Sequence, residues 1–464
     1  MSGGVEGIAT VGSNATAPGE AAPRHGAGMT STLTPAQGVG LSNTLRHPRW
    51  TPWHSDISAL LFLAVFGGLY WVGVATGYPM YRVWGGVACV GAVGALAVLW
   101  SAGEGREGIR RPVYSVLLAW SAGGGLVAGL LSRSLDGCGE IMLQCGAQME
   151  VPIVERAAAL WLSSGSPYLP ILEMSDAVVT DYNPYSPWMM VFGVPTAVFG
   201  QSWWTDMRLW SGLFVVVGLV AAWKLSGVSR GVSVVALRWL AVAPPVALSF
   251  ASSGVDLPVI VAALLGAVFV YRRAPLAAGA FLGVAVAFKL TAAPIAFVIL
   301  LVYWARRDIG GAVKAVSAGA AVLAAAYVPV LSVDLEGFME NVIRYTTGSA
   351  ELTSVAGAPT PGHLLSLIPV VGGTLAQLLL LSTAAVVLVL VLVRPPATPS
   401  VALVYAGWCL FAAMLVMPAS RIGYIIYPIT LIAAATVFNL SEAETSRSGN
   451  LPEREAGRLP AGVV

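Results

Sequence analysis

Residues 133–138 (RSLDGC) and 181–188 (DYNPYSPW) belong to one long polar interruption, which runs from Arg133 to Arg208 in an otherwise apolar chain. About a third of the chain's 23 acidic residues fall in this segment. They are Asp136, Glu140, Glu150, Glu155, Glu173, Asp176, Asp181 and Asp206. A membrane protein that gathers carboxylates, Tyr and Trp in one large loop is expected to carry out chemistry or recognition there.

The composition places the chain among polytopic membrane proteins. It has 464 residues, of which 57% are hydrophobic and only 10% are charged, whereas soluble domains carry about 25% charged residues. The mean hydropathy is +0.78. The net charge of +2 says nothing about nucleic acid, but the chain has no basic cluster of the kind that binds phosphate backbones, so no nucleic-acid partner is expected.

The apolar runs predict about 12 transmembrane helices, since a helix needs roughly 20 apolar residues to cross the hydrocarbon core. We expect the spans at 58–78, 84–101, 113–132, 209–226, 232–251, 256–271, 275–290, 292–304, 312–332, 374–393, 401–418 and 421–438.

The Lys and Arg residues between these spans predict the orientation, because cytoplasmic loops are enriched in both. If the basic turns are cytoplasmic, the N-terminus is inside and the spans alternate, provided that Trp188–Gln201 does not cross the membrane. The outer face then holds loops 133–208, 252–256, 334–361 and 419–421. Transporters more often place their polar groups at mid-membrane, so this one-sided distribution favours an enzyme at the outer leaflet.

Two pieces of the large loop are predicted to be helical. One is Val151–Ser163, with Pro152 in its first turn, where proline is tolerated. Its apolar residues could form a face that lies in the membrane interface. They are Val154, Ala158, Leu160, Trp161 and Leu162. The other piece is the segment from Trp188 to Gln201.

The four cysteines fall into two groups. Cys89 and Cys409 lie in apolar runs and are interpreted as small core residues. Cys138 and Cys145 lie in the polar loop, where they are either a disulfide that closes a short hairpin or two free thiols. No zinc site is expected, because the chain has four His and none is near these cysteines.

Four stretches of the sequence, taken together in their order along the chain, resemble those of a known protein family. The first runs from Glu150 through an amphipathic helix to the turn Gly165-Ser-Pro-Tyr168. The second is Tyr182-Asn-Pro-Tyr-Ser-Pro-Trp188 with the apolar segment to Pro195. The third is the Gly-rich helix from Gly279 to Lys289 and Pro294, and the fourth runs from Pro418 through Arg421 and Tyr424 to Pro428. Together they resemble the family 87 polyprenyl-phosphate-mannose-dependent mannosyltransferases of actinobacteria, which are GT-C glycosyltransferases.

The resemblance implies a fold and a division of the chain. The fold is an all-α polytopic membrane protein, a GT-C-like bundle of about 12 transmembrane helices. Its large extracytoplasmic loop carries two juxtamembrane helices. Residues 113–438 would be the catalytic core, with outer loops 133–208 and 334–361, and residues 51–112 an additional N-terminal hairpin. Residues 1–50 and 439–464 are polar and are predicted to be disordered tails.

A transfer of this kind needs a carboxylate that takes the proton of the acceptor hydroxyl. The resemblance points to the acid just before the first juxtamembrane helix, which here is Glu150, whereas the family usually has Asp. The alternative bases are Asp136 and Glu140. An equally simple interpretation of Glu150 is a helix N-terminal carboxylate that suits the helix dipole.

The leaving phosphate needs cations, and the sugar needs aromatic faces and hydrogen-bonding groups. Lys289 interrupts an apolar run and is a phosphate candidate, or else a Lys that reaches the interface. Arg421, with Tyr424 nearby, is the second phosphate candidate. Arg344 and His363 are weaker candidates for substrate binding. Asp181, Tyr182, Asn183 and Tyr185 are candidates for contacts with the sugar or the acceptor, although they could simply form a turn.

One further acid stands at the start of a predicted span. Asp256 is expected to cap its helix, and a role in holding a cation or an acceptor hydroxyl is the weaker interpretation. No phosphate-binding Gly-rich loop and no metal-ligand motif is present, so neither a cofactor nor a metal is predicted.

These features predict a multi-pass enzyme of the cell membrane with its active site on the extracytoplasmic side. As the resemblance implies, it would transfer a hexose, with mannose as the indicated sugar, from a polyprenyl-phosphate donor to a lipid, glycan or metabolite acceptor. The mechanism would be inverting and would use a carboxylate base. The alternatives are a lipid-linked sugar flippase or another transporter, and a diverged, inactive member of the family. Membrane lipid is the other expected partner.

Overall fold

The computed structural model describes residues 52–449, except 77, 104–105, 136–145 and 353–355. The described residues are almost entirely helical, and the one β-type pairing among them is a parallel bridge between Gly357 and Ser420. The predicted all-α fold is therefore confirmed. The tails at 1–50 and 450–464 and the Cys138–Cys145 pair lie outside the described residues.

The long apolar helices coincide with the predicted spans. Eight helices are long and apolar enough to cross a membrane by length and composition. They comprise α1 (Pro52–Trp71), α2 (Pro79–Ala102), the continuous α3, η2 and α4 (Arg110–Leu118, Ala119–Gly124, Gly125–Leu135), α7 (Met207–Ser226), α13 (Ile309–Val333), α17 (Gly372–Val393), α18 (Pro399–Val416), and η9 with α19 (Ile422–Ile425, Ile426–Gly449). Helix α19 thus continues into the predicted C-terminal tail.

The other four predicted spans correspond to less regular helices. Helices α8 (Arg230–Val242) and α9 (Pro244–Ser252) meet at a bend of 62° and together could form a ninth span. Helix α10 (Asp256–Tyr271), helix α11 (Pro275–Phe288) and the pair η7 and α12 (Leu290–Ala292, Ala293–Ala305) are shorter than 18 residues. The count of about 12 spans therefore stays a prediction.

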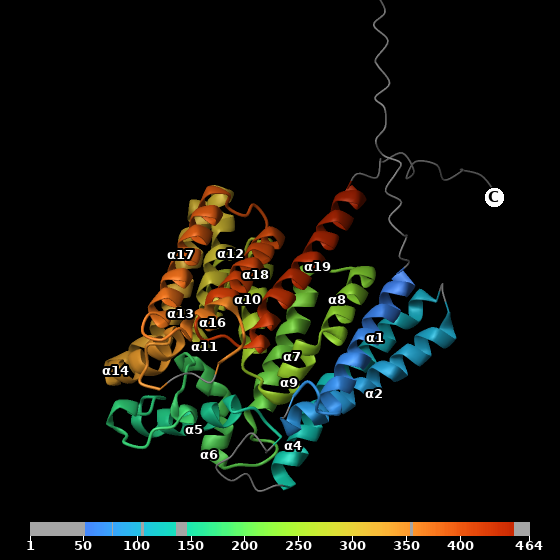
Figure 1. The fold of residues 1–464 in the computed structure, drawn as a ribbon. Coiled ribbons are helices and arrows are strands. Elements are labelled where there is room, and N and C mark those ends of the chain that lie inside the picture. The colour runs from blue at the N-terminus through green and yellow to red at the C-terminus, as the bar shows by residue number, and fades with distance from the viewer. Residues whose placement is uncertain (1–51, 77, 104–105, 136–145, 353–355, 450–464) are drawn as a thin grey trace, which may run out of the picture. The chain divides into compact units, whose positions relative to one another are not determined.

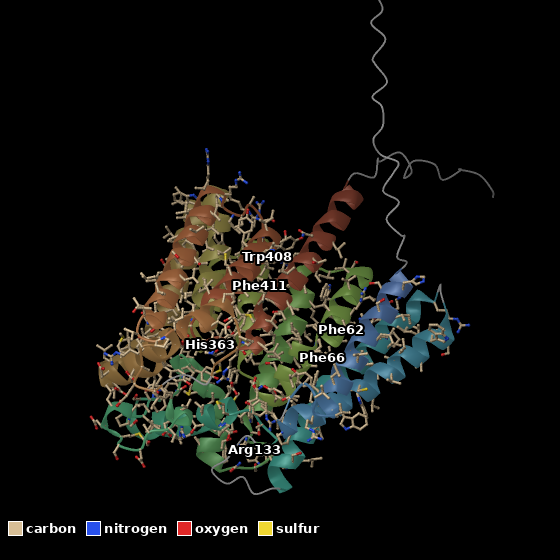
Figure 2. The ribbon with its side chains drawn as sticks, viewed as in Figure 1. Phe62, Phe66, Arg133, His363, Trp408 and Phe411 are labelled. Atoms are coloured by element: carbon tan, nitrogen blue, oxygen red, sulfur yellow. The ribbon has the colours of Figure 1, made fainter. Side chains whose placement is uncertain are left out.

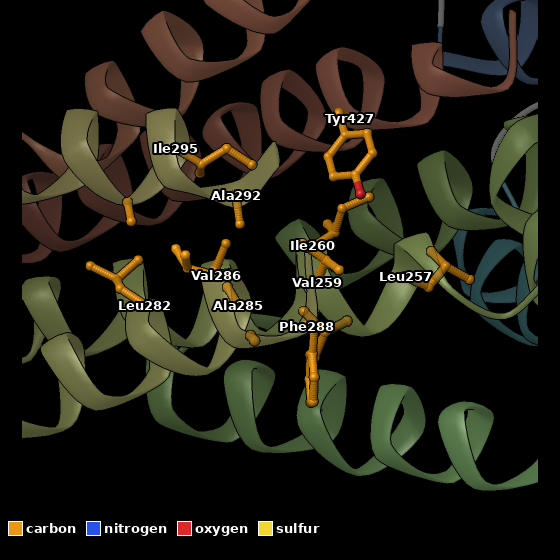
Figure 3. Close-up of a cluster of buried hydrophobic side chains, with 14 of the residues drawn as sticks. Leu257, Val259, Ile260, Leu282, Ala285, Val286, Phe288, Ala292, Ile295 and Tyr427 are labelled. Atoms are coloured by element: carbon orange, nitrogen blue, oxygen red, sulfur yellow. The ribbon is translucent and has the colours of Figure 1, made fainter. Parts of the chain in front are cut away.

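The three short helices α10, α11 and α12 form the centre of the main hydrophobic core. Figure 3 shows their buried side chains together with Tyr427 of α19. The same hydrophobic cluster includes Ala402, Leu403 and Ala406 of α18. Helix α11 packs closely on α13, because Gly279 has no Cβ that would collide with the backbone of Ala315. The near-continuous apolar sequences of α10, α11 and α12 are typical of helices that are buried on all sides. The polar residues at their ends are thus fixed by a close-packed interior.

The N-terminal helices have a hydrophobic cluster of their own. Helices α1 and α2 approach closely where Gly67 meets Gly85, and Phe62 and Phe66 lie along α1 with ring centroids 5.9 Å apart (Figure 2). This cluster also includes Tyr114 and Leu117 of α3 and Ala247 of α9. The predicted boundary between an additional hairpin and a core at residue 112 stays a prediction.

The large polar loop folds into short helices at one end of the long ones. They are α5 (Glu150–Ser164), η4 (Ile171–Glu173), η5 (Val179–Asp181), η6 (Pro187–Gly193) and α6 (Val194–Phe199). The second loop contains α14 (Leu335–Phe338), η8 (Met339–Arg344), α15 (Tyr345–Thr347) and α16 (Pro361–Ser366), and η1 (Glu107–Ile109) precedes α3. In Figure 1, α4, α5, α6 and α14 lie towards the same end, and α19 ends at the other.

Both loop segments that we predicted to be helical contain helices. The apolar face expected to lie in the membrane interface is largely packed against the protein core in the first of them, α5. Val154 and Ala158 of α5 are fully buried and belong to the main hydrophobic core, whereas Leu162 is exposed. Helix α5 packs along η6, and Gly193 allows η6 to approach the backbone of Val154. The apolar side of α5 therefore faces the protein, and a place for these helices in the membrane interface stays a prediction.

Buried ion pairs tie the ends of the large loop together. The Arg133 guanidinium bonds to Glu155 and Asp206, each at 2.6 Å, and Arg208 bonds to Asp206 at 2.9 Å. Arg208 is fully buried and also donates to the carbonyl oxygens of Gly146 and Ala251. Burial alone would raise the pKa of the Asp206 carboxyl, but hydrogen bonds from Arg208 and the charge of Arg133 lower it. Figure 2 shows Arg133 at the loop end of the helices.

Candidate active site

Four charged residues meet where helices begin or break. Glu150 opens α5 and Asp256 opens α10. Lys289 is an extended residue, with φ of −154° and ψ of 130°, between α11 and η7. Arg421 is likewise extended, between α18 and η9. Because helix interruptions leave backbone polar groups unpaired, they are the positions at which an apolar bundle can accommodate charged side chains.

The first ion pair joins Glu150 to Arg421. The Arg421 Nη1 group donates to Glu150 Oε1, and its Nη2 group lies 3.6 Å from the sulfur of Met149. The other carboxylate oxygen, Glu150 Oε2, is buried and has no hydrogen-bond partner among the described residues. The Glu150 side chain is 10% exposed and that of Arg421 is 33% exposed. Burial alone would lower the pKa of Arg421, but the Glu150 carboxylate raises it.

The second ion pair joins Lys289 to Asp256. The Lys289 ammonium donates to Asp256 Oδ1 at 2.6 Å, and the Tyr427 hydroxyl donates to the same oxygen at 2.7 Å. Figure 3 shows the Tyr427 hydroxyl pointing from α19 towards the side chains of α10. Val255 is the N-cap of α10, and no side-chain bond caps this helix. The interpretation of Asp256 as a helix cap was therefore wrong, since its carboxylate holds a cation instead.

Tyrosine rings surround the Lys289 ammonium. The distances from Nζ to the ring centroids are 5.5 Å for Tyr185, 5.0 Å for Tyr424 and 5.9 Å for Tyr427, all within the range of cation–π attraction. Tyr185 also connects the two ion pairs, because Glu150, Arg421 and Asp256 all act electrostatically on its phenol. Burial first, and then the Glu150 charge, raise the pKa of Tyr185 well above its ordinary value.

Hydrogen bonds from other loops fix the backbone on both sides of the site. The Ala358 amide donates to the Ser420 carbonyl at 2.9 Å. His363 Nδ1 lies 2.9 Å from the carbonyl oxygen of Pro418, which can only accept, so Nδ1 carries the proton. On the Tyr185 side, the Ser186 amide donates to the Phe288 carbonyl. His363 thus holds the segment that carries Arg421, and Figure 2 shows it on α16.

Several predicted substrate-binding residues make their contacts within the loops. The Asp181 carboxylate accepts from the Val178 amide and pairs with Arg156 at 3.5 Å. Tyr182 is fully buried, stacks on Tyr345 with centroids 4.4 Å apart and donates to Glu340 at 2.8 Å. None of these contacts involves the two ion pairs.

Two more predicted residues have the same structural character. The backbone amide of the buried Asn183 donates to the side-chain oxygen of Asn341, and the Asn183 side chain donates to the Pro167 carbonyl. Arg344 pairs with Glu336 and Glu340. Asp136 and Glu140, the alternative bases, lie outside the described residues. The structure thus brings together Glu150, Tyr185, Lys289, Arg421 and Tyr424 from the predicted set.

Sequence reasoning gave no role to Tyr427 and Tyr81. Tyr427 lies in a quoted motif, but nothing in the sequence pairs it with Asp256. Tyr81, on α2, lies close enough to Glu150 and Arg421 for their charges to act on it. An acid at the head of a fully apolar helix was the available signal for Asp256, because such a charge needs a buried counterion.

The described residues contain no group of three or more His, Cys, Asp or Glu side chains that could hold a metal ion. The arrangement itself offers a buried carboxylate with one unpaired oxygen, two cations and several tyrosines. A carboxylate of this kind can accept a proton, cations can stabilise a leaving phosphate, and tyrosine faces can stack on sugar C–H groups.

The helices and this polar cluster define a polytopic membrane protein with a preorganised ionic site at the ends of its core helices. The sequence profile of glycosyltransferase family 87 matches residues 183–418, which are 236 of the 464 residues. The chain belongs to glycosyltransferase family 87. The matched region includes Tyr185, Asp256 and Lys289, whereas Glu150 and Arg421 lie outside it.

Comparison with solved structures finds the crystal structure of ArnT from Cupriavidus metallidurans in the apo state. The two chains share 18% identity with a TM-score of 0.43, and the match covers 75% of this chain and 66% of ArnT, just under two thirds. No curated protein sequence matches this chain.

Proposed function

We propose that this family 87 enzyme transfers a hexose, with mannose as the expected sugar, from a polyprenyl-phosphate donor to a lipid, glycan or metabolite acceptor. The transfer takes place at the extracytoplasmic face of the cell membrane. The observation that carries the proposal is the meeting of a half-paired buried carboxylate, Glu150, with two cations, Arg421 and Lys289, around Tyr185. This is the set of groups that transfer from a lipid phosphate requires.

Glu150 acts as the base in this proposal. Its unpaired Oε2 accepts the proton of the acceptor hydroxyl. The acceptor oxygen then attacks the anomeric carbon from the face opposite the phosphate, and a new C–O bond forms. The bond between that carbon and the phosphate oxygen breaks, and the electron pair leaves with the polyprenyl phosphate. The sugar is inverted at the anomeric carbon.

Arg421 and Lys289 stabilise the negative charge that grows on the leaving phosphate. Both cations are paired with carboxylates in the structure, but the two pairs differ. Arg421 is a third exposed and lies on an extended segment, whereas Lys289 is held by Asp256 and surrounded by three rings. The donor phosphate therefore draws Arg421 away from Glu150, and this exchange leaves the base free when the donor is bound.

The proposal is tested with purified protein in liposomes that contain labelled polyprenyl-phosphate mannose and a membrane-lipid acceptor fraction. We expect the label to appear in a new covalent product, which is separated from the donor by chromatography. Label that crosses the bilayer without any new covalent product would contradict the proposal and favour a flippase.

The side of the membrane is tested separately, by cysteine accessibility in intact cells. Val370, between α16 and α17, and Ile309, at the start of α13, are both exposed and are predicted to lie on opposite faces of the membrane. A membrane-impermeant thiol reagent should label Val370→Cys and spare Ile309→Cys. The reverse pattern would place the site in the cytoplasm.

A further inference from the structure

The contacts of Asp256 are unusual for an acid at the start of a helix. Its Oδ1 atom accepts two hydrogen bonds, from the Lys289 ammonium and from the Tyr427 hydroxyl, and it caps no turn of α10. The Asp256 side chain is 14% exposed and that of Lys289 is 8% exposed. These three residues come from α10, the α11–η7 break and α19, so the contact joins elements that are distant in sequence.

A buried ammonium is stable only with a counterion and further bonds. Lysine has a flexible stem and three donors, so it does not by itself define a position. Here one donor is used by Asp256, while the other two have no hydrogen bond among the described residues. The Tyr427 hydroxyl restricts the rotation of the carboxylate, and the rings of Tyr185 and Tyr424 restrict the ammonium.

We propose that Asp256 and Tyr427 are positioning residues, which hold the Lys289 ammonium in place so that its two unused donors reach the phosphate of the lipid-linked donor. This inference rests on the proposed function for the identity of the ligand, a lipid phosphate. The placement of Lys289 itself rests only on the geometry. Asp256 and Tyr427 touch neither the sugar nor the acceptor, and they act through Lys289.

The proposal predicts a characteristic dependence on pH. The groups that face the Lys289 ammonium are Asp256, Glu150 and the tyrosines 185, 424 and 427. In Asp256→Asn the ammonium loses its nearest counterion and releases its proton at lower pH. The transfer rate should therefore fall about ten- to a hundredfold at pH 8, with a smaller loss at pH 6.5. Tyr427→Phe should show a smaller loss in the same direction.

A double-mutant cycle separates this role from a structural one. The proposal predicts that Asp256→Asn has no further effect on transfer in a Lys289→Gln background, because the residue to be positioned is gone. Fully additive losses would overturn it. The matched control is Asp308→Asn, since Asp308 likewise stands at a helix N-terminus but does cap its helix, by accepting a 2.8 Å bond from the Gly311 amide. This variant should leave the pH profile unchanged.

A second measurement does not depend on activity. Competitive acetylation with acetic anhydride at pH 8, read by mass spectrometry, reports how much of each lysine is uncharged. The label on Lys289, normalised to the exposed Lys314, should rise in Asp256→Asn relative to the wild type. Equal labelling overturns the positioning role. A rise in labelling together with a wild-type protein that transfers no sugar supports the positioning and rejects the proposed function.

Discussion

Two sets of buried ion pairs lie at the same end of this molecule, and they differ in how completely they are paired. In the first set, the carboxylates of Glu155 and Asp206 bond to Arg133, Arg208 and backbone amides. In the second set, Glu150 keeps one buried oxygen without a partner among the described residues. Glu155, Asp206 and Glu150 all belong to the polar loop 133–208.

The comparison shows how the loop divides its carboxylates between structure and chemistry. A buried ionic network stabilises only if its members are satisfied, and the first set meets this condition where it ties α4, α5 and α7 together. An unsatisfied buried oxygen costs free energy and therefore calls for another explanation. A role for Glu150 as the base that binds the acceptor hydroxyl would explain its unpaired oxygen.

The largest expected effect comes from breaking the first set of ion pairs, in which both carboxylates are fully hydrogen-bonded. Asp206→Asn removes the carboxylate between two buried guanidinium groups, so the protein should lose about 3–5 kcal/mol of stability. The loss is measured as an earlier thermal transition of the protein in detergent. The fraction that remains folded should keep its transfer rate. A variant that is stable but no longer transfers the sugar would instead show that Asp206 takes part in the active site.

A slightly smaller effect, on transfer rather than on stability, is expected from the second set. Arg421→Gln should lower the rate of transfer about 10²–10³-fold, because the leaving phosphate loses a charged donor. Binding of polyprenyl phosphate, measured by competition with the labelled donor, should weaken in parallel. Arg421→Lys is the control and should recover part of the rate. Unchanged binding in Arg421→Gln would show that Arg421 only neutralises Glu150.

The smallest effect is expected from Tyr182, a predicted sugar contact that the structure assigns to loop packing. Tyr182→Phe keeps the stacking on Tyr345 and removes the bond to Glu340. We expect a loss of about 1 kcal/mol in stability and no change in the KM for the donor. A raised KM for the donor with unchanged stability would show that Tyr182 contacts the substrate.

The sequence was sufficient for the helices, because apolar runs of this length have few other structures available to them. Lys289 and Arg421 stood out as ionisable residues beside apolar segments, and the family resemblance pointed to Glu150. It did not show that Arg421 lies against Glu150, 271 residues away, or that Asp256 pairs with Lys289. Pairing between distant helices depends on packing, which no local pattern contains.

The same limit explains where the contacts in the structure differ from those that the sequence led us to expect. Composition cannot distinguish the apolar face of α5 that packs on the core from one that packs on lipid, because Val154 and Ala158 suit both. Nor does a turn rich in Tyr, Asn and Pro show which of its side chains point inward. Of that turn, only Tyr185 faces the ion pairs, while Tyr182 and Asn183 bond to the second loop.

The most direct test of the central role of Glu150 is the rate of sugar transfer by Glu150→Gln in liposomes, compared with wild type and with Glu150→Asp. Glutamine keeps the shape but cannot accept the proton, so the rate should fall about 10²–10⁴-fold, while Asp, a shorter base, should retain a measurable part of it. Wild-type activity in a correctly folded Glu150→Gln protein would contradict the account and move the base elsewhere in the loop.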